Sequence, residues 1–260
     1  MTKNNFTILI ILFTFSSSLA LAKLTEVMAN DKSYDAEFDS YEAEFSNNTQ
    51  KEIYDPLEKI NRKIFAFNDT LDVYFFEPVA RAYRNYTPKP VRNSLHNFVL
   101  NLALPISALN SFAQGKVENG LATSSNFLIN TTVGIAGLFD VAGNKNIKYE
   151  PEDFGQTLGY YGVASGAYLV IPLLGPSTSR DFGGYVVDRS IDPFGFNFLE
   201  IGGSTKAIKP SYIVANAALY NLDLREGLLD PIADVKKDSF DLYATFRSVY
   251  IQQRDLKVKK

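Results

Sequence analysis

Cysteine is absent from this chain of 260 residues, and histidine occurs only once, as His96. The lack of cysteine excludes disulfides, thiol chemistry and a lipid-modified N-terminal cysteine. The sequence also lacks a nucleophile elbow, a phosphate-binding loop, a dinucleotide-binding glycine motif and a Cys/His metal spacing. A lipid hydrolase would need a general base, and a lone helical histidine is more typical of a polar surface position. We therefore predict a protein that is not an enzyme and holds no metal or cofactor.

Basic residues are too few to form a strongly positive surface. The chain has 26 basic and 29 acidic residues, a formal net charge of −3. We expect no nucleic-acid partner, because phosphate contacts require a basic face. Tryptophan is absent as well, yet 15 tyrosines and 20 phenylalanines make the composition rich in aromatic side chains. This excess fits either a large core or a lipid-facing surface.

The N-terminal 52 residues are predicted to lie outside the folded domain. Lys3 precedes an apolar stretch over residues 6–21 that closes on Ala20 and Ala22, so residues 1–22 predict a signal peptide, with an uncleaved anchor as the alternative. Residues 23–52 carry eight acidic residues against three lysines, which predicts a disordered acidic linker. We expect one domain over residues 53–255 and a basic tail over residues 256–260.

Hydrophobic periodicity predicts a helical protein. Residues 57–76 carry one apolar stripe about 100° wide, with a cap formed by Asp55, Pro56 and Glu58. Pro78 is expected to interrupt this helix, and a short helix follows up to Pro88. Further helices are expected over residues 91–102, 105–114, 211–225 and 231–254. The last has an aromatic stripe typical of core packing, at Phe240, Tyr243, Phe246 and Tyr250. Period-2 patterns are scarce, so the predicted class is all-α.

Two long segments carry no charge, and neither is typical of a transmembrane helix. Residues 154–179 contain five glycines and two prolines. A helix there would be too costly, at about 1 kcal/mol per glycine and about 3 kcal/mol for an internal proline. Its apolar part, residues 167–174, is shorter than the roughly 20 residues that cross a bilayer. We expect backbone at membrane depth that the protein itself shields. Residues 119–139 begin as a helix and are expected to bend over residues 131–137.

Polar residues beside these apolar segments are candidates for lining a lipid path. The candidates are Asn61, Asn68, Thr157, Tyr161 and Ser165. A lipid headgroup in hydrocarbon costs several kcal/mol, most of which a polar lining would remove. Alternatively, the two asparagines bond neighbouring helices. Arg180 and Asp181 end the uncharged run, and we expect a structural ion pair or helix cap at the membrane–water boundary.

Together these segments resemble the MlaA/VacJ family of outer-membrane proteins, over about residues 55–255. The matching residues are Asp55-Pro56-Leu57-Glu58, Asn61-Arg62, Phe67-Asn68, Arg92-Asn93, Asn97-Phe98, Phe127-Leu128-Ile129-Asn130-Thr131, Gly134, Gly137, Phe139-Asp140-Val141-Ala142-Gly143, Phe154-Gly155-Gln156-Thr157-Leu158-Gly159, Tyr161-Gly162-Val163, Gly166, Pro172-Leu173-Leu174-Gly175-Pro176-Ser177 and Arg180-Asp181.

The resemblance implies a single domain: a ring of amphipathic and membrane-embedded helices around a central amphipathic channel. It also implies an outer-membrane component of a retrograde phospholipid transport system. Such a protein passes mislocalised phospholipid from the outer leaflet to a periplasmic lipid-carrier protein, which maintains lipid asymmetry. Trimeric porins are further implied partners. Transport would be passive, because no nucleotide site is present. The alternative is a structural adaptor that docks on a porin without its own lipid path.

The resemblance also points to particular residues. The family hairpin that borders the channel corresponds here to Tyr160, Tyr161, Gly162, Ser165 and Gly166. The helix bordering the channel would contribute Asn61, Phe67 and Asn68. Family members usually carry a lipidated cysteine at the periplasmic face of the outer membrane. This chain has none, so lipid-facing helices, a porin or a retained leader would have to anchor it.

Overall fold

The computed structural model describes residues 53–192 and 210–260, with side chains except over residues 210–217. The predicted signal peptide and acidic linker lie outside these residues. The described elements are α4 (Glu58–Leu71), the π-helix η1 (Asp72–Phe76), α5 (Glu77–Tyr86), α6 (Lys89–Ala113), α7 (Val117–Thr132), α8 (Val141–Asn144), α9 (Phe154–Tyr160), β1 (Tyr168–Ile171), β2 (Gly175–Thr178), α10 (Ser179–Ile191), α11 (Pro210–Gly227), α12 (Leu229–Asp238) and α13 (Leu242–Lys259).

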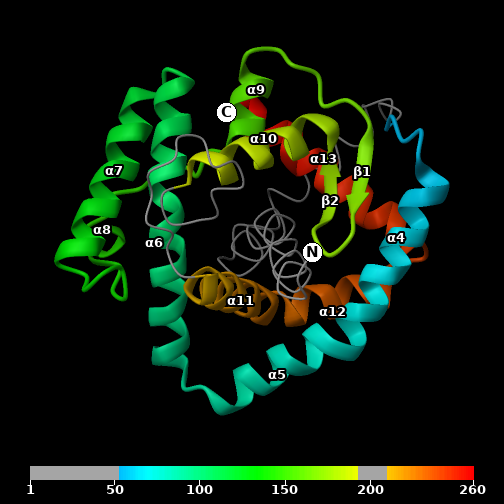
Figure 1. The fold of residues 1–260 in the computed structure, drawn as a ribbon, viewed down its shortest axis with the longest axis horizontal. Coiled ribbons are helices and arrows are strands. Elements are labelled where there is room, and N and C mark those ends of the chain that lie inside the picture. The colour runs from blue at the N-terminus through cyan, green and yellow to red at the C-terminus, as the bar shows by residue number, and fades with distance from the viewer. Residues whose placement is uncertain (1–52, 193–209) are drawn as a thin grey trace, which may run out of the picture.

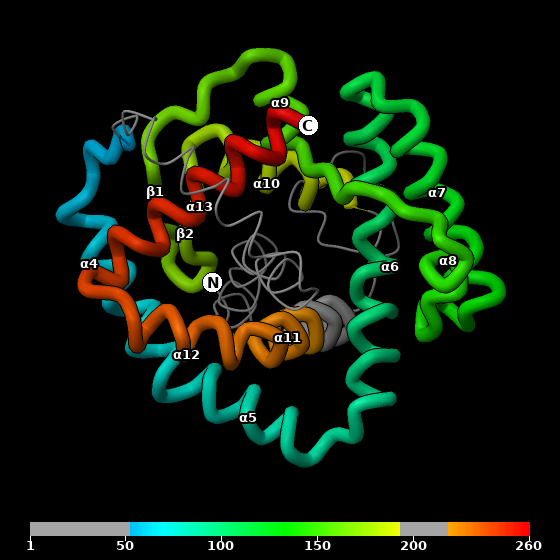
Figure 2. The backbone as a smooth tube through the Cα atoms, turned by 180° about the vertical axis from the view of Figure 1, so that it is seen from behind, coloured from blue at the N-terminus to red at the C-terminus, as the bar shows by residue number. Residues whose placement is uncertain are grey.

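The helices follow one another around a ring (Figure 1). α4, α5 and α6 form a long arc, and α9, α10, α13 and the two strands close the opposite side. α7 and α8 lie outside α6, whereas α11 and α12 run along the inner side of α5 (Figures 1 and 2). Apart from one pair of short strands the described chain is helical, which confirms the predicted all-α class. Within the described ranges, every helix is too short or too polar to qualify as a membrane span.

Two prolines do not break the helices that contain them, contrary to prediction. Pro78 lies in the first turn of α5, where a missing N–H is tolerated, and the π-helical turn η1 joins α5 directly to α4. Pro105 lies inside α6, which is a single helix rather than two. Val99, Leu104 and Ile106 of α6 are buried, and this packing offsets the cost of about 3 kcal/mol for an internal proline.

The predicted cap of the first helix is also wrong. The N-cap residue is Leu57, and no side chain caps the helix. The Asp55 carboxylate instead accepts hydrogen bonds from Asn61 Nδ2 at 2.8 Å, from Arg247 Nη1 at 2.8 Å and from the Tyr243 hydroxyl. Asp55 therefore ties the start of the domain to α13, because a nearly buried carboxylate is best satisfied by several donors.

The C-terminal region contains two helices where one was expected. Ser239 is extended and ends α12, and the Asp241 carboxylate accepts from the Ala244 N–H to begin α13. Asp241 thus acts as the N-cap of α13. α13 continues to Lys259, through most of the predicted basic tail. Of the aromatic stripe, Tyr243 and Tyr250 are buried as predicted, whereas Phe240 lies in the break and is fully exposed.

The glycine-rich run contains the two strands, which sequence periodicity did not predict. β1 and β2 pair antiparallel, with Tyr168 opposite Thr178 and Ile171 opposite Gly175. Tyr168 and Val170 pack with Tyr243 and Tyr250 of α13 in a buried apolar cluster, against Ile64 and Phe65 of α4. The predicted shielding of this segment by the protein is therefore present, since α4 and α13 cover β1.

The predicted bend after the first half of the second uncharged segment is confirmed. α7 ends at Thr132, and turns follow over residues 133–138. Ile135, Ala136 and Gly137 have φ of 54°, 57° and 90°. A left-handed conformation is uncommon for a β-branched residue such as Ile135, so this turn is held by its surroundings rather than by local preference.

Candidate functional site: an amphipathic cavity beside the hairpin

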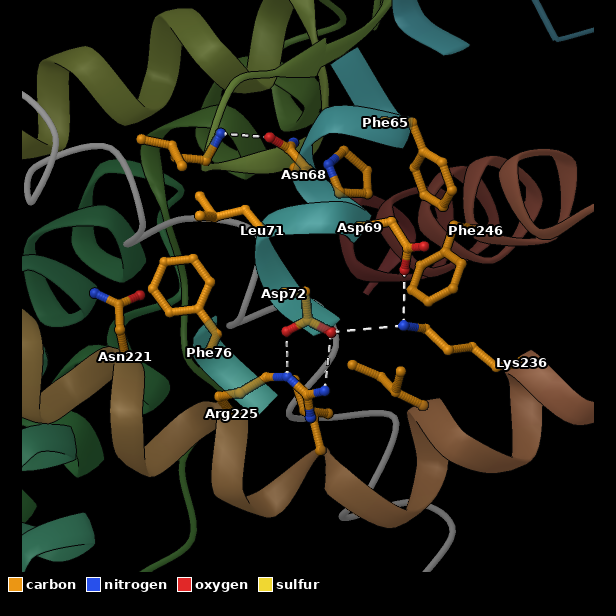
Figure 3. Close-up of a pocket in the computed structure, with 15 residues that line it drawn as sticks. Phe65, Asn68, Asp69, Leu71, Asp72, Phe76, Asn221, Arg225, Lys236 and Phe246 are labelled. Carbon is orange, nitrogen blue, oxygen red and sulfur yellow. Dashed lines mark hydrogen bonds and ion pairs between the residues drawn. The ribbon is translucent and has the colours of Figure 1, made fainter. Parts of the chain in front are cut away.

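A cavity of about 180 Å³ lies between α4, η1, the hairpin, α11, α12 and α13 (Figure 3). For comparison, a cavity of about 150 Å³ in another protein accommodates benzene. The lining is mostly apolar with a polar wall, and consists of Phe65, Asn68, Asp69, Leu71, Asp72, Phe76, Leu173, Gly175, Pro176, Asn221, Arg225, Leu228, Ile232, Lys236 and Phe246. The cavity is therefore large enough for a headgroup or a short piece of acyl chain.

The π-helical turn η1 positions part of this lining. Asp72 begins the turn and Phe76 ends it, and both line the cavity. In Figure 3 the Asp72 carboxylate points down to Arg225, while Leu71 and Phe76 extend to the left of it. A π-turn inside an otherwise α-helical segment shifts the face that side chains occupy, and such turns occur often at functional sites.

The polar wall of the cavity consists of two linked ion pairs. Arg225 of α11 donates from Nε and Nη2 to the two Asp72 oxygens at 2.6 and 2.9 Å. Lys236 Nζ of α12 lies 2.7 Å from Asp69 Oδ1 and 3.7 Å from Asp72 Oδ2. A bidentate arginine–carboxylate pair is a strong, directional contact, so the positions of Arg225 and Asp72 are fixed relative to each other.

Two nitrogens of this wall, Arg225 Nη1 and Lys236 Nζ, are buried and make no hydrogen bond within the part of the chain that the structure describes. Lys236 Nζ still has its ion pair with Asp69, whereas Arg225 Nη1 has no partner among the described residues. The Arg225 side chain is 11% exposed, Asp72 19%, Lys236 26% and Asp69 37%. The wall is therefore half-buried, and it retains an unused donor at Arg225 and an accessible carboxylate at Asp69.

Asn68 holds the tip of the hairpin at the edge of the cavity. Its Nδ2 donates to the Ile171 carbonyl at 3.0 Å, and its Oδ1 accepts from the Leu173 N–H at 2.8 Å. Leu173 has φ of 66°, which is unfavourable for a residue with a side chain, and it lines the cavity. Asn68 thus compensates locally for a strained turn.

Asn61 is a structural residue of the hairpin. It is 2% exposed. Its Nδ2 donates to the Tyr168 carbonyl at 3.0 Å and its Oδ1 accepts from the Val170 N–H at 2.9 Å. The sequence left open whether Asn61 and Asn68 line a lipid path or bond neighbouring helices. In the structure both amide groups form hydrogen bonds, and their partner is the hairpin rather than a helix. Asn68 also lines the cavity, whereas Phe67 is exposed on α4 outside the lining.

Of the five residues that the resemblance placed in a hairpin, Tyr160 ends α9 and the other four lie in the loop between α9 and β1. Tyr160 and Tyr161 are 50% and 67% exposed, and the Tyr161 hydroxyl donates to the Ala113 carbonyl of α6. Gly162 and Gly166 have φ of 85° and 72°, a region that favours glycine. The Ser165 carbonyl accepts from the Arg180 N–H at 3.1 Å. None of the five lines the cavity among the described residues; the β-hairpin itself is formed by residues 168–178.

Thr157 is also remote from the cavity. It is buried between α6 and α9, where its hydroxyl is bonded to Asn110 and Gln114. Gln114 in turn donates to Glu152 at 3.0 Å. These contacts belong to a polar interface between two helices and the loop before α9. Thr157 therefore stabilises the fold and cannot contact a lipid in this arrangement.

Arg180 and Asp181 form the expected ion pair, inside a larger buried network. Arg180 Nε lies 3.0 Å from Asp181 Oδ1, and Arg254 of α13 binds both Asp181 and Asp153 through two nitrogens each. The Tyr250 hydroxyl donates to Asp181 at 2.9 Å. Burial alone would raise the pKa of Asp153 and Asp181, but the Arg254 guanidinium lowers both below their usual range. Thr178, rather than this pair, caps α10.

His96 is paired with a carboxylate rather than free on the surface. Its Nδ1 lies 2.6 Å from Asp223 Oδ2, which joins α6 to α11. Arg92 and Arg84 bind Glu226 of α11 close by, at the same junction between helices. These contacts agree with a structural role for His96. No group of three or more histidine, cysteine, aspartate or glutamate side chains suited to a metal ion occurs over residues 53–192 and 210–260.

Sequence reasoning missed the charged wall of the cavity. Asp69, Arg225 and Lys236 were not singled out from the sequence. Asp72 and Arg225 lie 153 residues apart in the chain, and Asp69 and Lys236 lie 167 residues apart, so no local pattern links either pair. The one available signal is the spacing of Asp69 and Asp72, because residues three apart lie on the same side of a helix.

Comparison with known proteins identifies the family. A family model described as MlaA lipoprotein matches residues 53–257. The chain belongs to this family. A protein from Rickettsia felis is 35% identical over 258 residues, covering 97% of this chain and 94% of its own. The MlaA family match includes the whole ring of described helices except the last residues of α13.

Two further relatives have informative names. The Escherichia coli K12 protein named intermembrane phospholipid transport system lipoprotein MlaA is 38% identical over 205 residues, 77% of each chain. A Haemophilus influenzae protein of the same name is 33% identical over 220 residues, 82% of this chain and 84% of its own. A solved structure, reported as the structural basis for maintenance of bacterial outer membrane lipid asymmetry, has a TM-score of 0.67 and 36% identity. It covers 78% of this chain and 98% of the solved one. Fold and family are therefore shared with MlaA proteins.

Proposed function

We propose that this MlaA family member is an outer-membrane component of a retrograde phospholipid transport system. It passes mislocalised phospholipid from the outer leaflet, through a channel within the ring of helices, to a periplasmic lipid-carrier protein, and so maintains lipid asymmetry. The observation that carries the proposal is the amphipathic cavity at the inner side of α4 and η1. The names of the relatives support the same process, since they describe intermembrane phospholipid transport.

The cavity has the two properties that a lipid path requires. Its apolar lining, which includes Phe65, Leu71, Phe76 and Leu173, offers a surface that acyl chains can contact without exposure to water. Its wall of Asp72 and Arg225 offers charge and hydrogen bonds for a headgroup, whose burial without partners would cost several kcal/mol. One site thus matches both parts of a phospholipid.

Exposed apolar side chains on η1 and α5 support a location in the membrane. Tyr74, Phe75 and Val79, on η1 and α5, are 82%, 56% and 42% exposed. Contiguous exposed apolar side chains mark sites that contact lipid or another protein. We propose that this face contacts the inner leaflet of the outer membrane and a trimeric porin, which would anchor a chain that has no cysteine to lipidate.

The second candidate is a structural adaptor that docks on a porin and has no lipid path. The same exposed face on η1 and α5 favours it, because docking alone would explain that surface. The half-buried charged cavity favours transport, because an adaptor has no use for it. The two functions differ in whether the purified protein carries phospholipid.

The decisive experiment is made in a strain that lacks the protein. Under the transport proposal, loss of the protein leaves phospholipid in the outer leaflet and makes the envelope sensitive to detergent. Restoring the wild-type chain reverses both effects. Normal surface lipid in the deletion strain would refute transport. Purified protein incubated with labelled phospholipid should leave the lipid intact, and release of free fatty acid would show a hydrolase instead.

A further inference from the structure

The ion-paired wall of the cavity is balanced in charge, which restricts the headgroups that it can accept. Arg225 and Lys236 supply two positive charges, and Asp69 and Asp72 supply two negative charges, all within one connected set of contacts. Glu77 lies 3.6 Å from Arg225 Nη2 and is itself paired with Arg81 at 2.7 Å, so the edge of the wall is balanced in charge as well. A headgroup with net negative charge would therefore meet as much repulsion as attraction.

Two atoms of the wall are available to a ligand, and they have opposite charge. Arg225 Nη1 is a buried donor without a partner among the described residues. A charged donor left without a hydrogen bond in a half-buried site costs free energy, and a ligand oxygen that accepts from it recovers most of that free energy. The Asp69 carboxylate is the most exposed member of the wall, and it is paired with Lys236. It can accept a further hydrogen bond from a cation.

We propose that this cavity selects zwitterionic phospholipid headgroups that carry a primary ammonium over anionic headgroups. The ammonium binds the Asp69 carboxylate, and the phosphate lies on the Arg225 side of the wall. The glycerol end of the lipid then lies toward the apolar lining at Leu173 and Phe76. This inference rests on the proposed function and adds the lipid class that the site prefers.

The test measures which lipid the full-length, detergent-solubilised protein retains. The protein is incubated with vesicles of equal phosphatidylethanolamine and phosphatidylglycerol, purified again, and its lipids are counted by mass spectrometry. Wild-type protein should be enriched in phosphatidylethanolamine. Asp69→Asn removes a negative charge and the ammonium acceptor, so the ratio should shift toward phosphatidylglycerol by about fivefold, or roughly 1 kcal/mol. Lys236→Gln removes a positive charge and should shift the ratio in the opposite direction.

The control is Glu150→Gln, which changes the net charge by the same amount as Asp69→Asn. Glu150 is 57% exposed and pairs with Lys260, remote from the cavity lining. It should leave the lipid ratio at the wild-type value. Circular dichroism of each variant establishes folding, and Lys236→Gln alone decides the matter if Asp69→Asn does not fold.

The outcomes separate this inference from the proposed function. Wild-type protein that retains no phospholipid would refute the transport proposal itself. Wild-type protein that retains both lipids in the vesicle ratio would overturn the headgroup preference while leaving transport intact. A ratio that responds equally to Asp69→Asn and Glu150→Gln would overturn the role of Asp69, because bulk charge would then explain the change.

Discussion

Asn68→Ala should release the tip of the β-hairpin without unfolding the domain. The substitution removes the acceptor of the Leu173 N–H and the donor to the Ile171 carbonyl, which are bonded at 2.8 and 3.0 Å. Each lost bond costs about 1 kcal/mol, and up to about 3 kcal/mol if the freed group stays dry. The free energy that holds the tip closed should therefore fall by about 2 kcal/mol if water reaches both freed groups, and by about 4 kcal/mol if one of them stays dry. Leu173 is strained at a φ of 66°, and the turn then keeps the Leu174 N–H bond to the Ile171 carbonyl at 3.2 Å.

Hydrogen–deuterium exchange measures this opening directly. A loss of about 2–4 kcal/mol speeds exchange of the Leu173 amide by about 30-fold to several hundred-fold, at 1.4 kcal/mol per factor of ten. The free energy of unfolding should fall by less, because Tyr168 and Val170 remain packed against Tyr243 and Tyr250. Since Leu173 lines the cavity, the same variant should also change the amount of phospholipid that the protein retains.

Asn119→Ala is a matched control. Asn119 also bonds backbone with both ends of its amide group. Its Nδ2 donates to the Glu150 carbonyl at 2.8 Å, and its Oδ1 accepts from the Glu150 N–H at 2.7 Å. This contact is remote from the hairpin, so exchange should increase at Glu150 and not at Leu173. Unchanged exchange of Leu173 in Asn68→Ala, or the same increase in both variants, would refute the assignment of Asn68 as the residue that holds the tip.

Three further predictions concern the junction of α9 and α10 and the loop that follows α9. Burial raises the pKa of Asp188 to about 7, so its contribution to stability is full below about pH 4 and is lost as the pH rises through 7. Urea titration from pH 5 to 8 should show the part of this loss that falls in that range, at most about 3 kcal/mol, and Asp188→Asn should lack it; parallel profiles would contradict the assignment. Gly184→Ala should lower the free energy of unfolding by about 1–3 kcal/mol, because the new Cβ would lie 2.3 Å from the Gly155 nitrogen. Gly183→Ala, whose Cβ meets nothing within 4 Å, should be neutral or stabilising, and equal effects would exclude close helix packing as the cause. Gly162→Val and Gly166→Val should impair surface-lipid clearance more than they reduce protein level, since both residues have positive φ in an exposed loop; equal losses would count against a functional loop.

Helix positions were largely predictable because their signals are local. The apolar stripe from Leu57 onward identified α4, and the β-branched and glycine residues after Asn130 identified the bend that ends α7. Proline was misleading at Pro78 and Pro105. Its local preference is to end a helix, but a first-turn position and buried packing each remove the penalty. Local rules thus failed where neighbouring elements supplied the compensation.

The hairpin and the cavity could not be predicted, because long-range contacts create them. Tyr, Val and Ile of β1 favour a strand, but β1 has only four residues and β2 contains a glycine and a proline, so no period-2 pattern is visible. β1 is held by Asn61, which lies 107 residues before the Tyr168 carbonyl that it binds. The resemblance placed the channel-bordering hairpin at residues 160–166, which precede the paired strands at residues 168–178. The strands begin only where side chains of α4 and α13 cover the backbone.

One chemical device recurs in this fold and explains how its uncharged, irregular segments remain buried. Irregular backbone needs hydrogen-bond partners, and in several such segments an asparagine side chain supplies them. Asn61 and Asn68 satisfy the hairpin, Asn126 donates to the Ile147 carbonyl at 2.9 Å, and Asn130 accepts from the Ala142 N–H at 2.9 Å. A primary amide offers a donor and an acceptor but no charge, so it can pair with a peptide group without the cost of burying an ion. The asparagines therefore allow loops and a hairpin to pack against the helices without burying further charges.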